Sequence, residues 1–252
     1  MPPSRAGVHR VLSAARQARA LAPSRFLGVA GVVAISFGAL TACSAFSSAG
    51  THAPATKTIA ADRQGGWKIT VYVTPVERYY GGSPREITGC LTVNCGYRND
   101  DHDLGSYPVG FVRRVKDEGT GLITSGPQAG HYLDWSAGVS DSGYWLDTVA
   151  RDSYGGALRP FVAAASDTLP RFTKVRVVGC GTNTDGTAVD RHACAVLRAG
   201  KWQILDQFTP GLGGSHHIDL YIGDETQPNF ENTSPLWITW TGATLVTSPP
   251  AR

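Results

Sequence analysis

The segment from His217 to Ile222 alternates polar and apolar side chains, and this period of two indicates a β-strand with one buried face. The aliphatic members would share the face that packs into a core: Ile218, Leu220 and Ile222. The other face would carry an imidazole, a carboxyl group and a phenol: His217, Asp219 and Tyr221. Asp219 could then serve as an acid–base group that His217 or Tyr221 orients. The alternative is a surface strand whose polar face is simply solvated.

A second carboxyl group lies just upstream of this strand. Asp206 closes another predicted strand, Trp202–Asp206, and a glycine-rich loop connects it to the strand that carries Asp219. We therefore place the candidate site in the stretch Leu205–Gly223, with Asp219 and Asp206 as its candidate catalytic residues.

Further short runs of β-branched and aromatic residues predict a mostly β domain. These runs are Trp67–Thr74, Phe161–Ala165, Thr173–Val178 and Pro235–Thr241. Residues 77–160 show few clear strands, so we expect a long, irregular insertion after the first strand. Six or seven short strands, little helix and no internal repeat predict an all-β barrel or sandwich.

Several shorter features of the chain have local interpretations. Pro108–Lys116 predicts a short helix with proline in its first turn, and Arg198–Lys201 predicts a hairpin turn. Asn99–Asp103 is interpreted as a solvated polar loop. Two aromatic clusters, His131–Trp135 and Tyr144–Asp147, could stack against sugar rings or fill a core.

The N-terminus has the features of an export signal. Five arginines lie between Arg5 and Arg25, and an apolar run of 15 residues follows, too short to span a bilayer as a helix. The run ends in Leu-Thr-Ala before Cys43, which resembles the bacterial lipobox. We therefore expect a signal peptide over residues 1–42, a lipid on Cys43, and anchoring to the outer face of the cell membrane or the periplasmic side of an envelope membrane. The alternative is an ordinary signal peptide with an incidental cysteine.

Removal of the leader changes the charge balance. The whole chain has a formal charge of +3, but without the five leader arginines 18 basic residues face 20 acidic ones, which gives −2. No basic patch of the nucleic-acid-binding kind remains, so we exclude that partner class. Residues 43–63 are small and polar and predict a flexible tether. The folded domain would cover residues 64–245, with a tail over 246–252.

An even number of cysteines remains in the exported chain. Four cysteines outside the cytoplasm predict two disulfides, which could form in three connectivities. Closeness in sequence favours pairing Cys90 with Cys95 and Cys180 with Cys194.

The motifs around three aspartates resemble a known family. Asp167-Thr-Leu-Pro precedes a strand, Leu205-Asp206 closes a later one, and His217-Ile-Asp219-Leu-Tyr221 follows. This ordered set resembles the 3D domain, named for three aspartates, which forms the catalytic double-psi β-barrel of the membrane-bound lytic transglycosylase A family. The resemblance implies a six-stranded double-psi barrel, with Asp219 as the acid, Asp206 as its partner and Asp167 in a supporting role.

The resemblance also implies a reaction. Lytic transglycosylases cleave the β-1,4 bond between MurNAc and GlcNAc in peptidoglycan without water, and one carboxyl group acts first as acid and then as base. Related barwin-like endoglucanases take a second aspartate from the first strand, where this chain reads Tyr72-Val-Thr74 and offers none. Transglycosylation is therefore favoured over hydrolysis, although Glu77 or Asp206 could still supply the second carboxyl group. We expect the protein to act as a monomer without a cofactor, with Tyr72 and Thr74 as substrate-binding residues.

Other functions remain as alternatives. A hydrolytic endoglycosidase could use the same barrel, and an expansin-like module could bind cell-wall polysaccharide without cleaving it. A metallopeptidase is disfavoured because His216 and His217 point to opposite faces of a strand and no His-Glu-x-x-His motif occurs, so we predict no metal site. A serine hydrolase is disfavoured because no Gly-x-Ser-x-Gly motif occurs.

Overall fold

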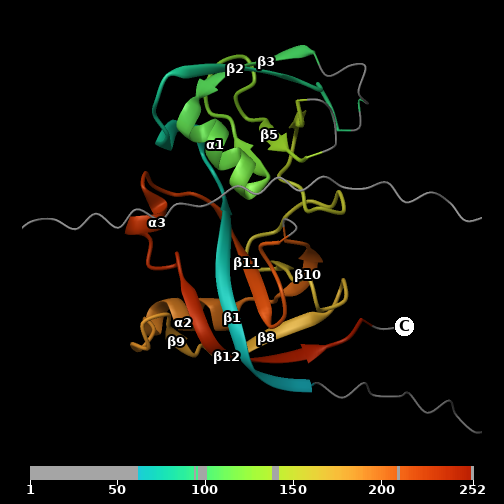
Figure 1. Cartoon of the computed structure of the whole chain (residues 1–252). Coiled ribbons are helices and arrows are strands. Elements are labelled where there is room, and N and C mark those ends of the chain that lie inside the picture. Colours follow the sequence, from blue (N-terminus) through green and yellow to red (C-terminus); the bar gives the residue numbers. More distant parts are fainter. Residues whose placement is uncertain (1–61, 94, 96–100, 138–141, 209–210, 251–252) are drawn as a thin grey trace, which may run out of the picture. The chain divides into compact units, whose positions relative to one another are not determined.

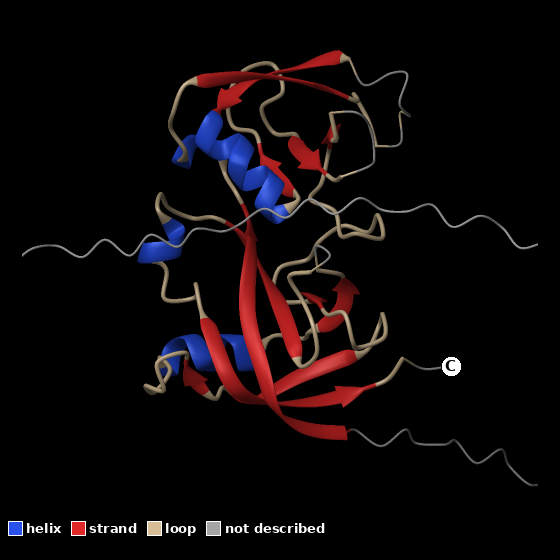
Figure 2. Ribbon diagram, in the orientation of Figure 1, coloured by secondary structure: helices blue, strands red, loops and turns tan. Residues whose placement is uncertain are grey.

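Six strands of one sheet close into a ring in the computed structural model, which describes residues 62–93, 95, 101–137, 142–208 and 211–250. Figures 1 and 2 show these strands. Around the ring they are β1 (Asp62–Thr74), β11 (His217–Asp224), β7 (Ala163–Ala165), β10 (Gln203–Asp206), β8 (Lys174–Gly179) and β12 (Thr239–Ser248), which pairs again with β1. A seventh strand, β9 (Thr182–Asn183), pairs with β12. The prediction of a mostly β domain built on six strands is confirmed.

The alternation read from the sequence is the reason these strands close around a core. Ile69 and Val71 of β1 and Ile218 and Leu220 of β11 are buried in one hydrophobic cluster. Full burial of such a side chain contributes roughly 1.5–3 kcal/mol. The two strands run parallel, with Thr70 beside Asp219 in the register. The polar face of β11 is therefore fixed against the polar face of β1, and it is not a solvated surface: Tyr221 and His217 are also buried.

One helix was predicted and another was missed. α1 (Val109–Glu118) confirms the expected helix after Pro108 and buries Phe111, Val112 and Val115. α2 (Arg191–Ala199) was not predicted, and it ends where the sequence suggested a hairpin turn at Arg198–Lys201, so that prediction was wrong. Asp190 begins α2 by accepting a hydrogen bond from the Ala193 backbone N–H at 2.7 Å. Two shorter elements are the 3₁₀ turn η1 (Glu77–Tyr79) and α3 (Phe230–Thr233).

The insertion is a regular substructure, so the expectation of an irregular one was wrong. It contains a two-stranded sheet, β2 (Pro84–Gly89) with β3 (His102–Pro108), and a three-stranded sheet, β4 (Thr120–Leu122), β5 (Tyr132–Trp135) and β6 (Tyr144–Asp147). It has a hydrophobic cluster of its own around Phe111 and Leu133. Tyr144 and Trp145 are buried, which favours core packing over a glycan platform for these rings. β2 and β3 contain proline, glycine and charged residues and few β-branched ones, so they carried too little pattern to be recognised.

Several predicted boundaries shift by a few residues. β12 runs to Ser248, so the tail predicted from residue 246 is wrong at its start, and residues 235–238 precede the strand that was expected to include them. β1 begins at Asp62, inside the predicted tether. Both expected disulfides form, Cys90–Cys95 and Cys180–Cys194. The signal peptide, Cys43 and most of the tether lie outside the described residues, and no described helix is long and apolar enough to cross a membrane.

Polar side chains join the insertion to the ring. Arg114 of α1 forms an ion pair with Glu231 of α3 at 2.6 Å, and its guanidinium lies 5.0 Å from the centre of the Trp237 ring. Tyr80 donates a hydrogen bond to Glu225, just beyond β11, at 2.6 Å. These contacts hold the insertion against the segment that connects β11 to β12.

Candidate active site

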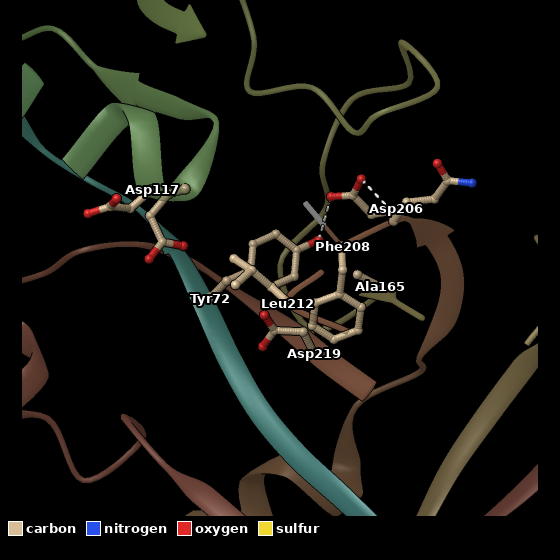
Figure 3. Close-up of a pocket in the computed structure, with 9 residues that line it drawn as sticks. Tyr72, Asp117, Ala165, Asp206, Phe208, Leu212 and Asp219 are labelled. Carbon is tan, nitrogen blue, oxygen red and sulfur yellow. Dashed lines mark hydrogen bonds between the residues drawn. The ribbon is translucent and has the colours of Figure 1, made fainter. Parts of the chain in front are cut away.

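A pocket of about 90 Å³ lies where the end of α1 meets the ring. Figure 3 shows Tyr72 pointing toward Asp206, with Asp219 beside it and Asp117 at the end of α1 across from them. The lining residues are Tyr72, Asp117, Glu118, Ala165, Asp206, Gln207, Phe208, Leu212 and Asp219. Four of the nine are carboxylic acids and none is basic. The pocket therefore suits a neutral, hydroxyl-rich ligand or one that develops positive charge.

Asp219 is held at this pocket by the parallel pairing of β11 with β1. Thr70 Oγ1 donates a hydrogen bond to Asp219 Oδ1 at 2.8 Å. Burial raises the pKa of Asp219 to about 7, although the bonds from Thr70 and the Leu220 backbone lower it; the nearby charge of Asp206 raises it further. A carboxyl group with this pKa is substantially protonated near neutral pH and can donate a proton.

Thr70 also connects Asp219 to His217. The Thr70 hydroxyl oxygen lies 2.9 Å from His217 Nε2, and His217 Nδ1 lies 3.4 Å from the Gly213 carbonyl oxygen. Burial and the charge of Lys68 lower the pKa of His217, which favours the neutral form of its ring. A threonine hydroxyl has one hydrogen and two acceptor sites. It can donate to ionised Asp219, or accept from protonated Asp219 and donate to His217.

Asp206 is fixed more rigidly than Asp219. It accepts hydrogen bonds from the Tyr72 hydroxyl at 3.0 Å and from the backbone N–H groups of Ser153 and Gln207 at 2.8 and 2.9 Å. Burial raises the pKa of Asp206, and these donors oppose that shift. Burial beside two carboxyl groups holds the pKa of Tyr72 well above its usual value, so its phenol remains a donor.

The insertion supplies a carboxyl group that sequence reasoning missed. Glu118 lines the pocket from the last turn of α1, and Arg114 Nη2 pairs with it at 2.9 Å. Burial raises the pKa of Glu118 to about 8; Arg114 lowers it, and the charge of Asp219 raises it. Asp117 and Glu118 close the helix at the end where the backbone dipole disfavours acids. That unfavourable placement is the one signal in the sequence that could have identified this residue.

Not every predicted site residue reaches the pocket. The hydroxyls of Thr74 and Tyr221 lie 2.6 Å apart and bond to each other, and neither residue lines the pocket. The hydrogen-bonding partner of the Asp219 carboxyl is Thr70, whereas His217 reaches it only through Thr70. Asp167 is exposed and accepts from the Gly214 backbone N–H at 3.0 Å, so it fastens the glycine-rich loop.

The loop after Asp206 contributes an apolar wall. Phe208 packs against the His217 ring with 4.4 Å between ring centres, and Leu212 is 65% exposed at the pocket. Residues 209 and 210 between them lie outside the described part of the chain. Among the described residues, no group of three or more histidine, cysteine or acidic side chains has the arrangement of a metal site.

Comparison with known proteins gives a result from structure but none from sequence. No family model and no curated protein matches the chain. Escherichia coli MltA with bound chitohexaose is 13% identical, with a TM-score of 0.47 over 76% of each chain. A membrane-bound lytic murein transglycosylase from Agrobacterium tumefaciens is 13% identical, with a TM-score of 0.39 over 73% of this chain and 74% of that one. The chain resembles these lytic transglycosylase structures.

Proposed function

We propose that this protein is a lytic transglycosylase that cleaves the β-1,4 bond between MurNAc and GlcNAc in peptidoglycan. The observation that carries the proposal is Asp219, whose pKa of about 7 keeps a proton available at the edge of an acidic pocket. The motifs around Asp167, Asp206 and Asp219 that resemble the 3D domain support the same assignment. The double-psi connectivity of the ring is part of this proposal.

The reaction needs one carboxyl group in two roles. Protonated Asp219 gives its proton to the glycosidic oxygen, and the bond from that oxygen to C1 of MurNAc breaks with its electron pair leaving on the oxygen. The 6-hydroxyl oxygen of the same MurNAc then bonds to C1 and loses its proton to the Asp219 carboxylate. The products are a 1,6-anhydro sugar and a free 4-hydroxyl group, and Asp219 is protonated again. No water is consumed.

The neighbours of Asp219 support both steps. Positive charge develops at C1 as the bond breaks, and the oxygens of Asp206, fixed by three donors, favour it electrostatically. When Asp219 loses its proton, the Thr70 hydroxyl can donate to the carboxylate. When Asp219 is protonated again, the same hydroxyl can donate to His217. In this proposal Asp219 is catalytic, Asp206 stabilises charge, and Thr70 is a positioning residue.

Hydrolysis on the same pocket is the second candidate, because Glu118 supplies the extra carboxyl group that a hydrolase uses to activate water. A general base must be ionised before the reaction begins. The pKa of about 8 keeps Glu118 mostly protonated at neutral pH, which disfavours this role. We therefore favour transglycosylation.

The deciding experiment is digestion of purified peptidoglycan by the mature protein, followed by mass analysis. We expect products ending in 1,6-anhydro-MurNAc, each lighter by one water than the hydrolytic product. Asp219→Asn should abolish them, whereas Asp101→Asn, a change of the same kind at an exposed position, should not. Reducing-end products would indicate hydrolysis. Binding to sacculi without any cleavage would indicate a polysaccharide-binding module of the expansin-like kind.

We also propose that the protein is exported and lipid-anchored through Cys43. The leader pattern supports this, as do the two disulfides, which are typical of proteins outside the cytoplasm. Labelling cells with a fatty-acid analogue should mark the protein. Cys43→Ser should lose the label and release the protein from the membrane fraction.

A further inference from the structure

A second cluster of side chains lies beside the pocket and plays no part in the reaction described above. The guanidinium of Arg171 lies between two aromatic rings, with its carbon 4.0 Å from the centre of the Tyr154 ring and 4.6 Å from that of Phe172. Both rings are large and unusually exposed, at 42% for Tyr154 and 46% for Phe172. Exposed aromatic rings that flank a cation form a surface that can accept a ligand.

The chain holds this cluster in a strained backbone conformation. Phe172 has a φ of +68°, in the left-handed region that bulky residues rarely adopt. Its backbone N–H donates to the Ile204 carbonyl at 2.7 Å, and the Gln203 side chain donates to its carbonyl at 3.1 Å. Two bonds from β10 thus fix the backbone of Phe172 in this conformation. Strain of this kind gathers at functional sites.

Arg171 has a hydrogen-bond donor without a partner and no acidic side chain of the described residues paired with it. Its Nε is buried without a hydrogen-bond partner, and no acid of the described chain forms an ion pair with it. The partly buried Arg114 and Arg151, by contrast, are both paired with carboxylates. A guanidinium offers five donors in a fixed plane, and this plane matches a carboxylate in a bidentate pair. Arg171, which has no acidic partner in the described part of the chain and lies beside two exposed rings, is therefore suited to pair with such a ligand.

The cluster adjoins the Asp206 side of the pocket. Gln207, which lines the pocket, donates a hydrogen bond to the Tyr154 hydroxyl. Ser153, the residue before Tyr154, donates its backbone N–H to Asp206. The pocket itself presents four carboxyl groups and no base, so it offers no counter-charge to an anionic substituent on a bound glycan. Arg171 offers such a substituent a counter-charge just outside.

We propose that Arg171, held between Tyr154 and Phe172, binds a carboxylate of the peptide attached to MurNAc. The preferred substrate is then glycan that still carries its peptides, and the glycan chain binds in the pocket while the peptide crosses the aromatic rings. This inference rests on the proposed function, because it assumes that the pocket binds a peptidoglycan strand. It adds a binding site for a part of the substrate that takes no part in bond cleavage.

The first test compares two substrates. Wild-type mature protein and the Arg171→Gln variant are assayed on peptide-bearing peptidoglycan and on strands stripped of peptides by an amidase. Loss of a charge-assisted bidentate pair should lower kcat/KM on peptide-bearing strands by about tenfold or more, with a much smaller loss on stripped strands. Arg171→Lys should keep the charge and recover only part of the loss. Equal losses on both substrates, or none on peptide-bearing strands, would overturn the proposal.

The second test does not depend on cleavage. Calorimetry with the Asp219→Asn variant measures binding of a muramyl peptide with free carboxylates and of its fully amidated counterpart. The free acid should bind at least fivefold more tightly, and adding Arg171→Gln should remove the difference. If wild-type protein cleaves neither substrate but this difference remains, the reaction is refuted and the carboxylate site stands; if the two peptides bind equally, the site is refuted. Arg176→Gln, at an exposed arginine on β8, is the control for general charge loss.

Discussion

Thr70 Oγ1 lies 2.8 Å from Asp219 Oδ1, because the two residues are direct neighbours across the parallel pair of β1 and β11. The same hydroxyl lies 2.9 Å from His217 Nε2. The proton of Asp219 therefore lies close to the Thr70 hydroxyl, which can change from donor to acceptor. It also lies close to His217, whose neutral form is favoured by burial. This arrangement makes the protonation state of Asp219 the property to test first.

Replacing Thr70 should shift the pH dependence of cleavage. The bond from Thr70 favours ionised Asp219, so Thr70→Val should raise the Asp219 pKa and move the alkaline limb of kcat/KM upward by about one pH unit. The rate at pH 6 should also fall, because the carboxyl loses its orientation. Thr70→Ser, which keeps the hydroxyl, is the control. An unchanged limb in Thr70→Val would show that Asp219 is not the group whose ionisation limits the rate.

Glu118→Gln separates the two glycan-cleaving reactions. Glutamine resembles the protonated form of Glu118, which the pKa of about 8 makes the main form at pH 6.5. We therefore expect less than about threefold loss of anhydro product at that pH, whereas removal of a catalytic base commonly costs 100-fold or more. Product yield from purified sacculi measures this. A loss of that larger size, with intact folding by circular dichroism, would support hydrolysis through Glu118.

Arg114 should contribute more to the free energy of unfolding than an arginine in a single surface ion pair does. It pairs with both Glu118 and Glu231 and stacks on Trp237, so Arg114→Met leaves Glu118 buried without its partner. We expect a loss of roughly 2–3 kcal/mol in the free energy of unfolding, measured by urea denaturation at pH 8. Combining it with Glu118→Gln should recover part of this loss. Simple addition of the two single effects would contradict the coupling.

Ionisation of Asp134, in the insertion, should make the free energy of unfolding depend on pH. Burial raises the pKa of this carboxyl to about 7, above its ordinary 3.8. The folded state therefore binds the Asp134 proton more tightly than the unfolded state does. This binding contributes fully to the free energy of unfolding below about pH 4, and the contribution is lost as the pH rises through 7. Asp134→Asn should thus gain roughly 2–4 kcal/mol at pH 8 relative to wild type, with a smaller gain at pH 5.

Urea denaturation of the Asp134→Asn variant at both pH values measures that difference. Asp101→Asn, an exposed change of the same kind, should alter stability at neither pH. A gain of equal size at pH 5 and pH 8 would mean that the effect of Asp134→Asn comes from packing rather than from ionisation.

Local pattern predicted the ring strands well but the connecting structure poorly. The alternation in β1, β8 and β11 is readable because each strand buries one face in the same core. α2 was missed because it is short and begins inside a disulfide-bracketed segment that suggested irregular structure. The insertion was misjudged because its strands lack a clear alternation and its core residues come from four of them and a helix.

The sequence by itself determined that β11 has an aliphatic face and an acid-bearing face, and it identified Asp206 and Asp219 as neighbours across a glycine-rich loop. Only the tertiary structure decided what surrounds Asp219. Thr70 meets it through strand register, and Glu118 through the docking of α1. The half-buried Arg171 lies beside the site through Tyr154 and Gln207. Periodicity reports which face of an element is buried, whereas long-range packing alone determines which residues meet across it.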